Sequence, residues 1–203
     1  MTDATFAPSF KETRYRVLRG ALPAALLAHV RQVTAPLVRQ SSKGEMIEPD
    51  GIAVGASSWY GHLPLEGILD FLRPAVERGI GGDALLPTYS FARCYPRGTK
   101  LTRHRDRPAC EVSVTLPVAG SDVTPWPIHL GTRHKAIAAV DLQPGDALVY
   151  SGMELWHWRE PLQADWRVQL FLHYVRRDGA HAEWKFDKRA KLGDPPVVGM
   201  PEA

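Results

Sequence analysis

The sequence predicts a mainly β fold with flanking helices, arranged as a sandwich or a barrel. Residues 88–175 have the pattern of about eight short strands with turn residues between them, which is the spacing of such folds. Two segments of helical periodicity precede this region. With 203 residues the chain has a length at which all-β domains commonly stay undivided, so we expect one domain over residues 1–203.

The part of the chain before residue 62 is predicted to hold one strand, one helix and a loop-rich segment. The strand is expected over residues 14–18. The helix is expected over residues 21–40, because leucine and valine side chains recur there at helical spacing, and Pro36 is expected to disturb its end. Residues 41–61 have the composition of loops and turns.

A second helix is predicted over residues 65–78. Pro64 stands at its opening, where the missing amide hydrogen would have had no helical partner. Pro74 is expected to bend or split the helix. Together with the first helix it gives a helical support over about residues 20–80, whose apolar faces can cover a sheet.

The β core is expected over residues 85–177 and a polar tail over residues 178–203. Four basic residues of this tail are expected to be solvated: Lys185, Lys188, Arg189 and Lys191.

The composition is that of an ordinary globular protein, with 44% hydrophobic and 23% charged residues. The sequence has no apolar run that could cross a bilayer and no apolar core of a signal peptide, so the cytosol is the expected compartment. Two cysteines, Cys94 and Cys110, form neither a disulfide framework nor a zinc pattern, and Cys94 is expected to be a reduced core residue.

Three polar residues of the strand-rich region suggest a metal site. His104 and Asp106 are two residues apart, so on an extended segment both side chains point to one side. His157, in an aromatic-rich strand, can supply a third ligand. Two imidazoles and one carboxylate suit Fe(II) and leave three coordination positions open. A single His-x-Asp triplet can arise by accident, and buried histidines are more often satisfied by hydrogen bonds than by metals.

Two further residues favour the hypothesis of a metal site. Tyr95 precedes His104 by nine residues, and Arg167 follows His157 by ten. Arg167 begins a segment in which arginine, glutamine, phenylalanine and histidine alternate with apolar residues. One face of this strand can therefore line a cavity, where a guanidinium can pair with a carboxylate. The alternative is a surface arginine on an edge strand.

These motifs resemble those of the prolyl-4-hydroxylase-like 2-oxoglutarate- and Fe(II)-dependent oxygenases. Residues 94–106 look like the tyrosine, the glycine turn and the His-x-Asp of that family. Residues 126–130, 143–147 and 157–167 then follow in the family's order. The resemblance covers residues 85–177.

The resemblance implies a double-stranded β-helix (jelly-roll) barrel that carries out oxygen-dependent hydroxylation. It implies Fe(II) held by His104, Asp106 and His157, with no other catalytic residue, and 2-oxoglutarate bound between the iron and Arg167. By the same comparison, Tyr95 matches a tyrosine that hydrogen-bonds the co-substrate. The chain departs from the family at Gln169, where serine or threonine is common.

Two other arginines compete for roles in the cavity. Arg159 lies close to His157 and is a rival cation for the co-substrate, ranked lower because it precedes a predicted turn at residues 160–161. Arg93 shares a strand face with Tyr95, so it is a candidate contact for an anionic group of the substrate. A salt bridge from Arg93 to Glu111 is the alternative.

Two side-chain groups near the histidines have open roles. Trp156 and Trp158 flank His157 and should face away from the metal into packing contacts. Five basic residues precede or follow His104 and form either a positive rim for anionic substrates or a solvated face: Arg97, Lys100, Arg103, Arg105 and Arg107.

The expected activity is hydroxylation of a peptidyl residue, an amino acid or another small molecule, with release of succinate and CO2. Nucleic acid is an unlikely partner because the formal net charge is only +3, and no membrane partner is expected. The alternatives are a metal-binding barrel that does not turn over and an oxygenase that modifies nucleic acids.

Overall fold

A computed structural model describes residues 9–45, 51–131 and 136–196. The elements follow one another as α1 (Phe10–Thr13), β1 (Tyr15–Leu18), α2 (Ala24–Ser42), β2 (Ser57–Tyr60), α3 (Leu63–Ile80), β3 (Leu85–Pro96), β4 (Leu101–His104), η1 (Pro108–Cys110), β5 (Val112–Gly120), β6 (Ile128–Gly131), β7 (Ile137–Val140), β8 (Ala147–Tyr150), β9 (Trp156–Arg159), β10 (Trp166–Arg176) and η2 (Ala182–Lys188). The strands β3 to β10 confirm the prediction of a strand-rich core.

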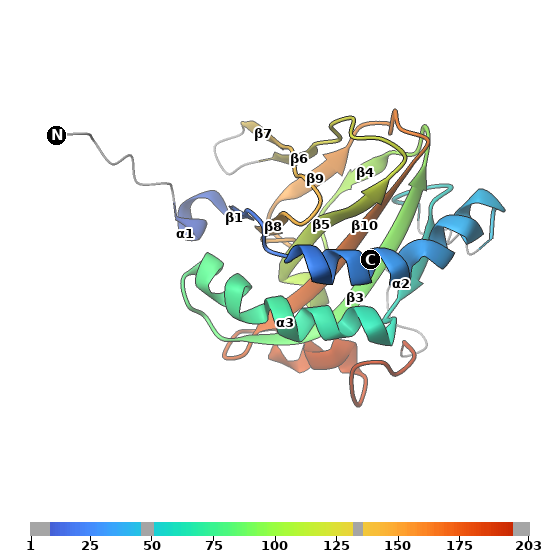
Figure 1. Cartoon of the computed structure of the whole chain (residues 1–203). Coiled ribbons are helices and arrows are strands. Elements are labelled where there is room, and N and C mark those ends of the chain that lie inside the picture. Colours follow the sequence, from blue (N-terminus) through green and yellow to red (C-terminus); the bar gives the residue numbers. More distant parts are fainter. Residues whose placement is uncertain (1–8, 46–50, 132–135, 197–203) are drawn as a thin grey trace.

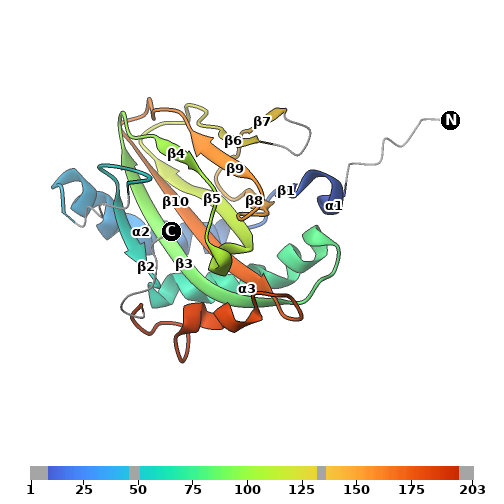
Figure 2. The ribbon, with the colours of Figure 1, turned by 180° about the vertical axis from the view of Figure 1, so that it is seen from behind.

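The strands form two antiparallel sheets that face each other (Figures 1 and 2). The larger sheet has the order β1-β8-β5-β10-β3-β2 and the smaller one β4-β9-β6-β7. Side chains from both sheets meet in one apolar cluster, in which Ile128 and Leu130 of β6 join Leu148 and Tyr150 of β8. The space between the sheets is therefore filled mainly by the inward side chains of both.

Helices α2 and α3 cover the outer face of the larger sheet (Figure 1). Alternation along β10 separates the two environments. Val168, Leu170 and Leu172 belong to the core under the helices. The alternate residues of the strand, beginning with Arg167, face the other sheet. The predicted polar and apolar faces of this strand are thus confirmed.

Pro74 does not split α3, contrary to one of the two outcomes expected there, and α2 continues past Pro36 to Ser42. Pro36 lies inside α2 and Pro74 inside α3. The carbonyl groups that lose a helical donor belong to Gln32 and Asp70, four residues earlier, and both residues are exposed. Water can hydrogen-bond these carbonyls, so the helices continue.

A short strand, β2, lies in the segment that was expected to be loop-rich. It pairs with the edge of β3, where Trp59 stands opposite Ala92. Trp59 is further fixed by a hydrogen bond from its indole nitrogen to Gln40 at 2.9 Å. Among the described residues, no helix combines the length and the apolar character needed to cross a membrane.

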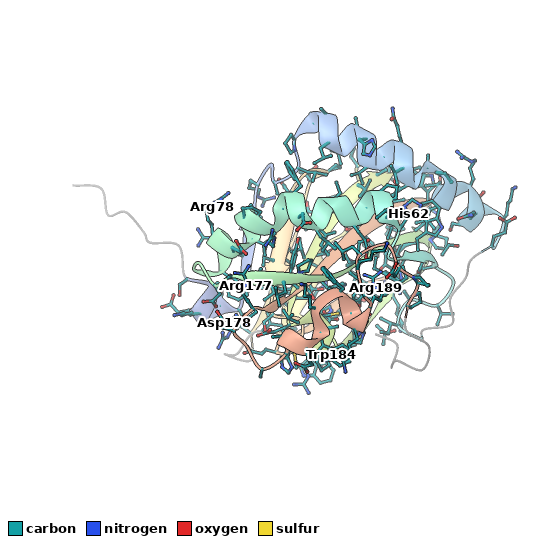
Figure 3. All side chains as sticks on the ribbon, turned by 90° about the horizontal axis from the view of Figure 1, so that it is seen from below. His62, Arg78, Arg177, Asp178, Trp184 and Arg189 are labelled. Carbon is teal, nitrogen blue, oxygen red and sulfur yellow. The ribbon has the colours of Figure 1, made fainter. Side chains whose placement is uncertain are left out.

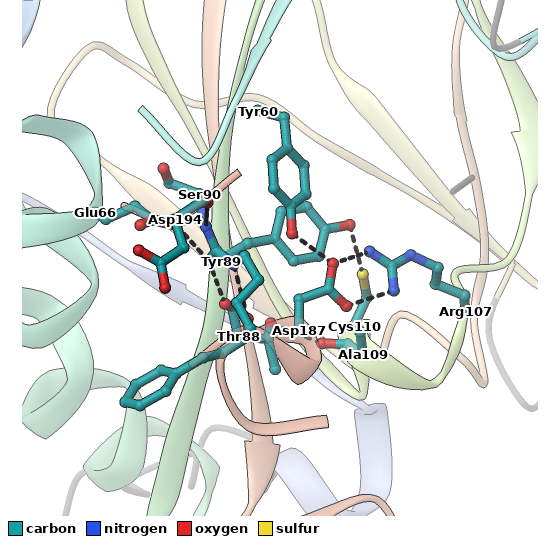
Figure 4. Close-up of polar contacts among 12 residues, drawn as sticks. Tyr60, Glu66, Thr88, Tyr89, Ser90, Arg107, Ala109, Cys110, Asp187 and Asp194 are labelled. Carbon is teal, nitrogen blue, oxygen red and sulfur yellow. Dashed lines mark hydrogen bonds and ion pairs between the residues drawn. The ribbon is translucent and has the colours of Figure 1, made fainter. Parts of the chain in front are cut away.

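The segment after β10 is not merely a solvated tail, so the expectation for Arg189 is wrong. Arg189 is 6% exposed, and its guanidinium donates to Glu66 on α3 at 2.7 Å and to the carbonyl of Thr88 at 2.9 Å. Figure 3 shows Trp184 and Arg189 on this segment. Asp187 is also buried and accepts hydrogen bonds from Arg107 and Tyr60 (Figure 4).

Replacement of Arg189 should strongly destabilise the protein. Arg189→Met would leave the Glu66 carboxylate buried without its cation, which typically costs about 3–5 kcal/mol. Urea unfolding followed by far-UV circular dichroism measures this loss. Arg177→Met, at an exposed position, is the matched control and should change stability by less than about 0.5 kcal/mol. Equal stability of the two variants would mean that the Glu66–Arg189 pair does not anchor the segment.

Candidate metal centre

His104 and Asp106 lie where β4 ends and the chain turns away. The imidazole Nε2 of His104 is 3.4 Å from a carboxylate oxygen of Asp106. The backbone amide of Asp106 donates to the carbonyl of Gly152 at 2.9 Å, which ties this turn to the loop after β8. The predicted approach of these two side chains is therefore present.

His157 reaches the same carboxylate from β9. Strand pairing places His157 directly opposite His104, and the two ring centroids are 4.2 Å apart. Its Nε2 is 3.3 Å from the same oxygen of Asp106, and its side chain is 2% exposed. The donor atoms of all three residues lie within 4.8 Å of one another. Ligands about 2.0–2.2 Å from an ion and at right angles to each other are about 3 Å apart, so the three atoms fit around one ion.

The orientation of both imidazole rings suits metal binding through Nε2. The Nδ1 atom of His104 lies 2.7 Å from the carbonyl oxygen of Thr102, and that of His157 lies 3.0 Å from the carbonyl oxygen of Leu155. A ring that donates from Nδ1 to a carbonyl carries its lone pair on Nε2. This is the arrangement that usually orients histidine ligands.

Asp106 is held by a second set of contacts. Its other carboxylate oxygen accepts a hydrogen bond from Ser113 at 2.7 Å. Burial alone would raise the pKa of Asp106, but the charge of His157 and hydrogen bonds from both histidines outweigh it and hold the pKa well below the usual range. Asp106 is therefore a carboxylate at neutral pH, which is the form that binds a cation.

A second group of possible ligands shares Asp106, and sequence analysis missed it. This group consists of Asp106, Cys110 and His173, whose ligand atoms also lie within 4.8 Å of one another. The Cys110 thiol lies 3.1 Å from the Tyr89 hydroxyl (Figure 4), and burial raises the pKa of that thiol well above its usual value. A protonated thiol is a poor metal ligand, so the two imidazoles favour the first group.

Arg167 and Tyr95 lie on the interior side of the larger sheet, as predicted. They stand opposite each other in the pairing of β10 with β3. Arg167 is 7% exposed, and its guanidinium donates to the carbonyl of Thr124 at 2.8 Å. Gln169, where the chain departs from the family pattern, is 2% exposed and its amide oxygen lies 3.5 Å from the hydroxyl of Thr115.

Arg93 also faces the interior, but it does not pair with Glu111. Its Nε donates to the hydroxyl of Ser58 at 3.1 Å, and its guanidinium lies over the Phe91 ring at 4.8 Å. Glu111 instead forms an ion pair with Arg176, near the end of β10. The alternative proposed for Arg93 is therefore wrong.

The five basic residues around His104 do not form one continuous rim. Arg97 pairs with Asp165 on the surface, whereas Arg107 is half-buried and pairs with Asp187. Arg103 and Arg105 lie over the outward-facing ring of Trp156, at 5.1 Å and 4.9 Å from its centroid. Trp156 itself is 42% exposed, so it is a platform for arginines and not the packing residue that alternation suggested.

Replacement of Gly152 should disturb the position of the Asp106 carboxylate. A Cβ atom at this position would lie 2.2 Å from the Asp106 carboxylate and 2.7 Å from the Ser113 hydroxyl. Gly152→Ala should therefore lower the affinity for Fe(II) by about 10- to 100-fold, as loss of a supporting contact typically does. Anaerobic equilibrium dialysis measures the affinity. Gly67→Ala on α3, where nothing lies within 4 Å of the added atom, is the control. Equal affinities would refute the placement of Asp106.

Comparisons with known proteins place this site in a known fold. The sequence matches no protein-family model and no curated protein. The structure is similar to a Pseudomonas putida prolyl-4-hydroxylase, with TM-score 0.62, 19% identity and coverage of 83% of this chain and 95% of that one. It is similar to a 2OG-Fe(II) oxygenase family oxidoreductase from Burkholderia pseudomallei, with TM-score 0.67, 15% identity and coverage of 85% of this chain and 90% of that one. It is also similar to EctD from S. alaskensis, with TM-score 0.66, 15% identity and coverage of 97% of this chain and 90% of that one. The chain thus has the double-stranded β-helix fold of 2OG-Fe(II) oxygenases, which confirms the predicted fold class.

Proposed function

We propose that this protein is a 2-oxoglutarate- and Fe(II)-dependent dioxygenase that hydroxylates a small-molecule or peptidyl substrate and releases succinate and CO2. The approach of the Nε2 atoms of His104 and His157 to one oxygen of Asp106 carries this proposal. Two imidazoles and a carboxylate with open positions form the ligand set of non-haem Fe(II) oxygenases.

In this proposal, His104, Asp106 and His157 hold the iron, and residues around them keep the ligands in position. Ser113 fixes one oxygen of Asp106, and the carbonyl groups of Thr102 and Leu155 orient the two imidazole rings. The iron, when bound, supplies activation of dioxygen coupled to oxidative decarboxylation of the keto acid. No separate acid or base is needed.

The co-substrate would lie inside the barrel, with one carboxylate directed toward Arg167 and Tyr95. A guanidinium presents a planar pair of donors that matches a carboxylate, and a tyrosine hydroxyl adds a neutral donor. Both residues are almost fully buried, so their interactions with a bound carboxylate would be only weakly screened by water.

Two of the similar structures suggest the class of the primary substrate. One is named a prolyl-4-hydroxylase, and EctD was solved with 2-oxoglutarate and 5-hydroxyectoine. A peptidyl residue or a small molecule is accordingly the proposed substrate. Arg93 is our candidate contact for an anionic group of that substrate, because it lies on the same strand face as Tyr95.

The state of the cysteines and the arrangement of the basic residues bear on the setting of the reaction. Cys94 and Cys110 are both buried and free, which agrees with a reducing compartment such as the cytosol. A nucleic-acid substrate finds little support, because the basic residues around His104 do not form one continuous surface: Arg97 pairs with Asp165 and Arg107 with Asp187.

The proposal predicts that the protein releases succinate from 2-oxoglutarate only when Fe(II) and O2 are both present. His157→Ala should lose most iron binding and turnover, because only two of the three ligands remain. Anaerobic Fe(II) titration and a succinate assay with candidate substrate pools measure both. His29→Ala, at an exposed position on α2, is the control. Undiminished turnover by His157→Ala would remove this ligand, and iron binding without succinate would indicate a barrel that does not turn over.

A further inference from the structure

Arg159 is a second buried cation inside the barrel. It follows His157 by two residues on β9, so both side chains point inward from the smaller sheet. Arg159 is 3% exposed. Its Nη1 donates to the backbone carbonyl of Trp126, whereas its Nε and Nη2 are buried without a hydrogen-bond partner. Among the described residues, no carboxylate lies within ion-pair distance of this guanidinium, whereas Arg167 has Asp122 at 3.5 Å.

Other donors without partners accompany Arg159. The hydroxyl of Tyr95 and the Nε of Arg167 are likewise buried and unbonded. Tyr95 and Arg159 contact the same indole, because the Tyr95 ring lies 4.9 Å and the Arg159 guanidinium carbon 4.7 Å from the centre of the Trp126 ring. Arg167 stands opposite Tyr95 across two paired strands. Three side chains thus bring four unused donor atoms to one region of the interior.

Burying such a group of donors without an acceptor destabilises the folded protein. A buried charge or hydrogen-bonding group that has no partner loses its hydration and gains nothing in return. An arginine keeps its charge at neutral pH, so Arg159 is a buried cation. An anion with several acceptor atoms would satisfy all three side chains.

We propose that Arg159 and Arg167 together bind the distal carboxylate of a 2-oxo dicarboxylic acid, with Tyr95 as a third donor. This inference rests on the proposed function and adds Arg159 to Arg167 and Tyr95, the two residues to which the resemblance assigns the co-substrate. A carboxylate has about four lone-pair sites, enough to accept from two guanidinium groups and a hydroxyl. Arg159 therefore helps the site to select a dicarboxylic over a monocarboxylic keto acid.

The test compares two keto acids that differ only at the distal end. Calorimetric titration of the Mn(II)-loaded protein without O2 measures binding of 2-oxoglutarate and of 2-oxopentanoate, which lacks the distal carboxylate. Arg159→Gln should weaken 2-oxoglutarate binding by about 10- to 100-fold, the effect of losing a charged hydrogen bond, and leave 2-oxopentanoate binding unchanged. Arg159→Lys keeps the charge and should recover part of the loss. Arg103→Gln, exposed on the outer face of the same sheet, is the control.

Each other outcome contradicts the inference in a recognisable way. If Arg159→Gln binds 2-oxoglutarate as the wild type does, Arg159 is not a ligand of the carboxylate, and the proposed function stands. If Arg159→Gln binds both acids more weakly by the same factor, Arg159 only shapes the pocket through its hydrogen bond to the Trp126 carbonyl. If the wild type binds neither acid, the inference and the proposed function both fail.

Discussion

The pairing of β4 with β9 is the constraint on which the candidate site depends. It places His104 directly opposite His157 although they are distant in sequence. The turn after β4 then brings Asp106 beside the Nε2 atoms of both rings, with Gly152 next to its carboxylate. Because side chains alternate along a strand, a shift of this pairing by one residue would direct His157 outward and separate the three donors. The geometry of the site is thus a consequence of strand register.

The interior of the barrel holds three buried arginine side chains. Arg93, Arg159 and Arg167 are each at least nine-tenths buried between the sheets. Burial of charge opposes folding unless partners compensate, and Arg159 lacks a carboxylate in the described part of the chain. The apolar core under α2 and α3 supplies the stability that lets the space between the sheets hold these groups. Stability and chemistry are therefore divided between the two faces of the larger sheet.

Sequence patterns anticipated the features that depend on alternation. The two faces of β10, the inward side of Tyr95 and the approach of His104, Asp106 and His157 all follow from a period of two residues along strands. Contacts between distant polar residues gave no such signal. Arg189 looked like a surface residue of a polar tail, because its partner Glu66 lies 123 residues away in an apolar helix. Ser113 and Gly152 were missed because a serine and a glycine reveal their role only when Asp106 is beside them.

The central claim is that one ion is shared by His104, Asp106 and His157. Anomalous diffraction from a crystal of the Zn(II)-loaded protein tests it most directly, since it locates the ion without reference to activity. We expect a single peak at about 2.0–2.2 Å from the Nε2 atoms of both histidines and from an oxygen of Asp106. A peak bound by Cys110 and His173, or none beside the two Nε2 atoms, would contradict the claim.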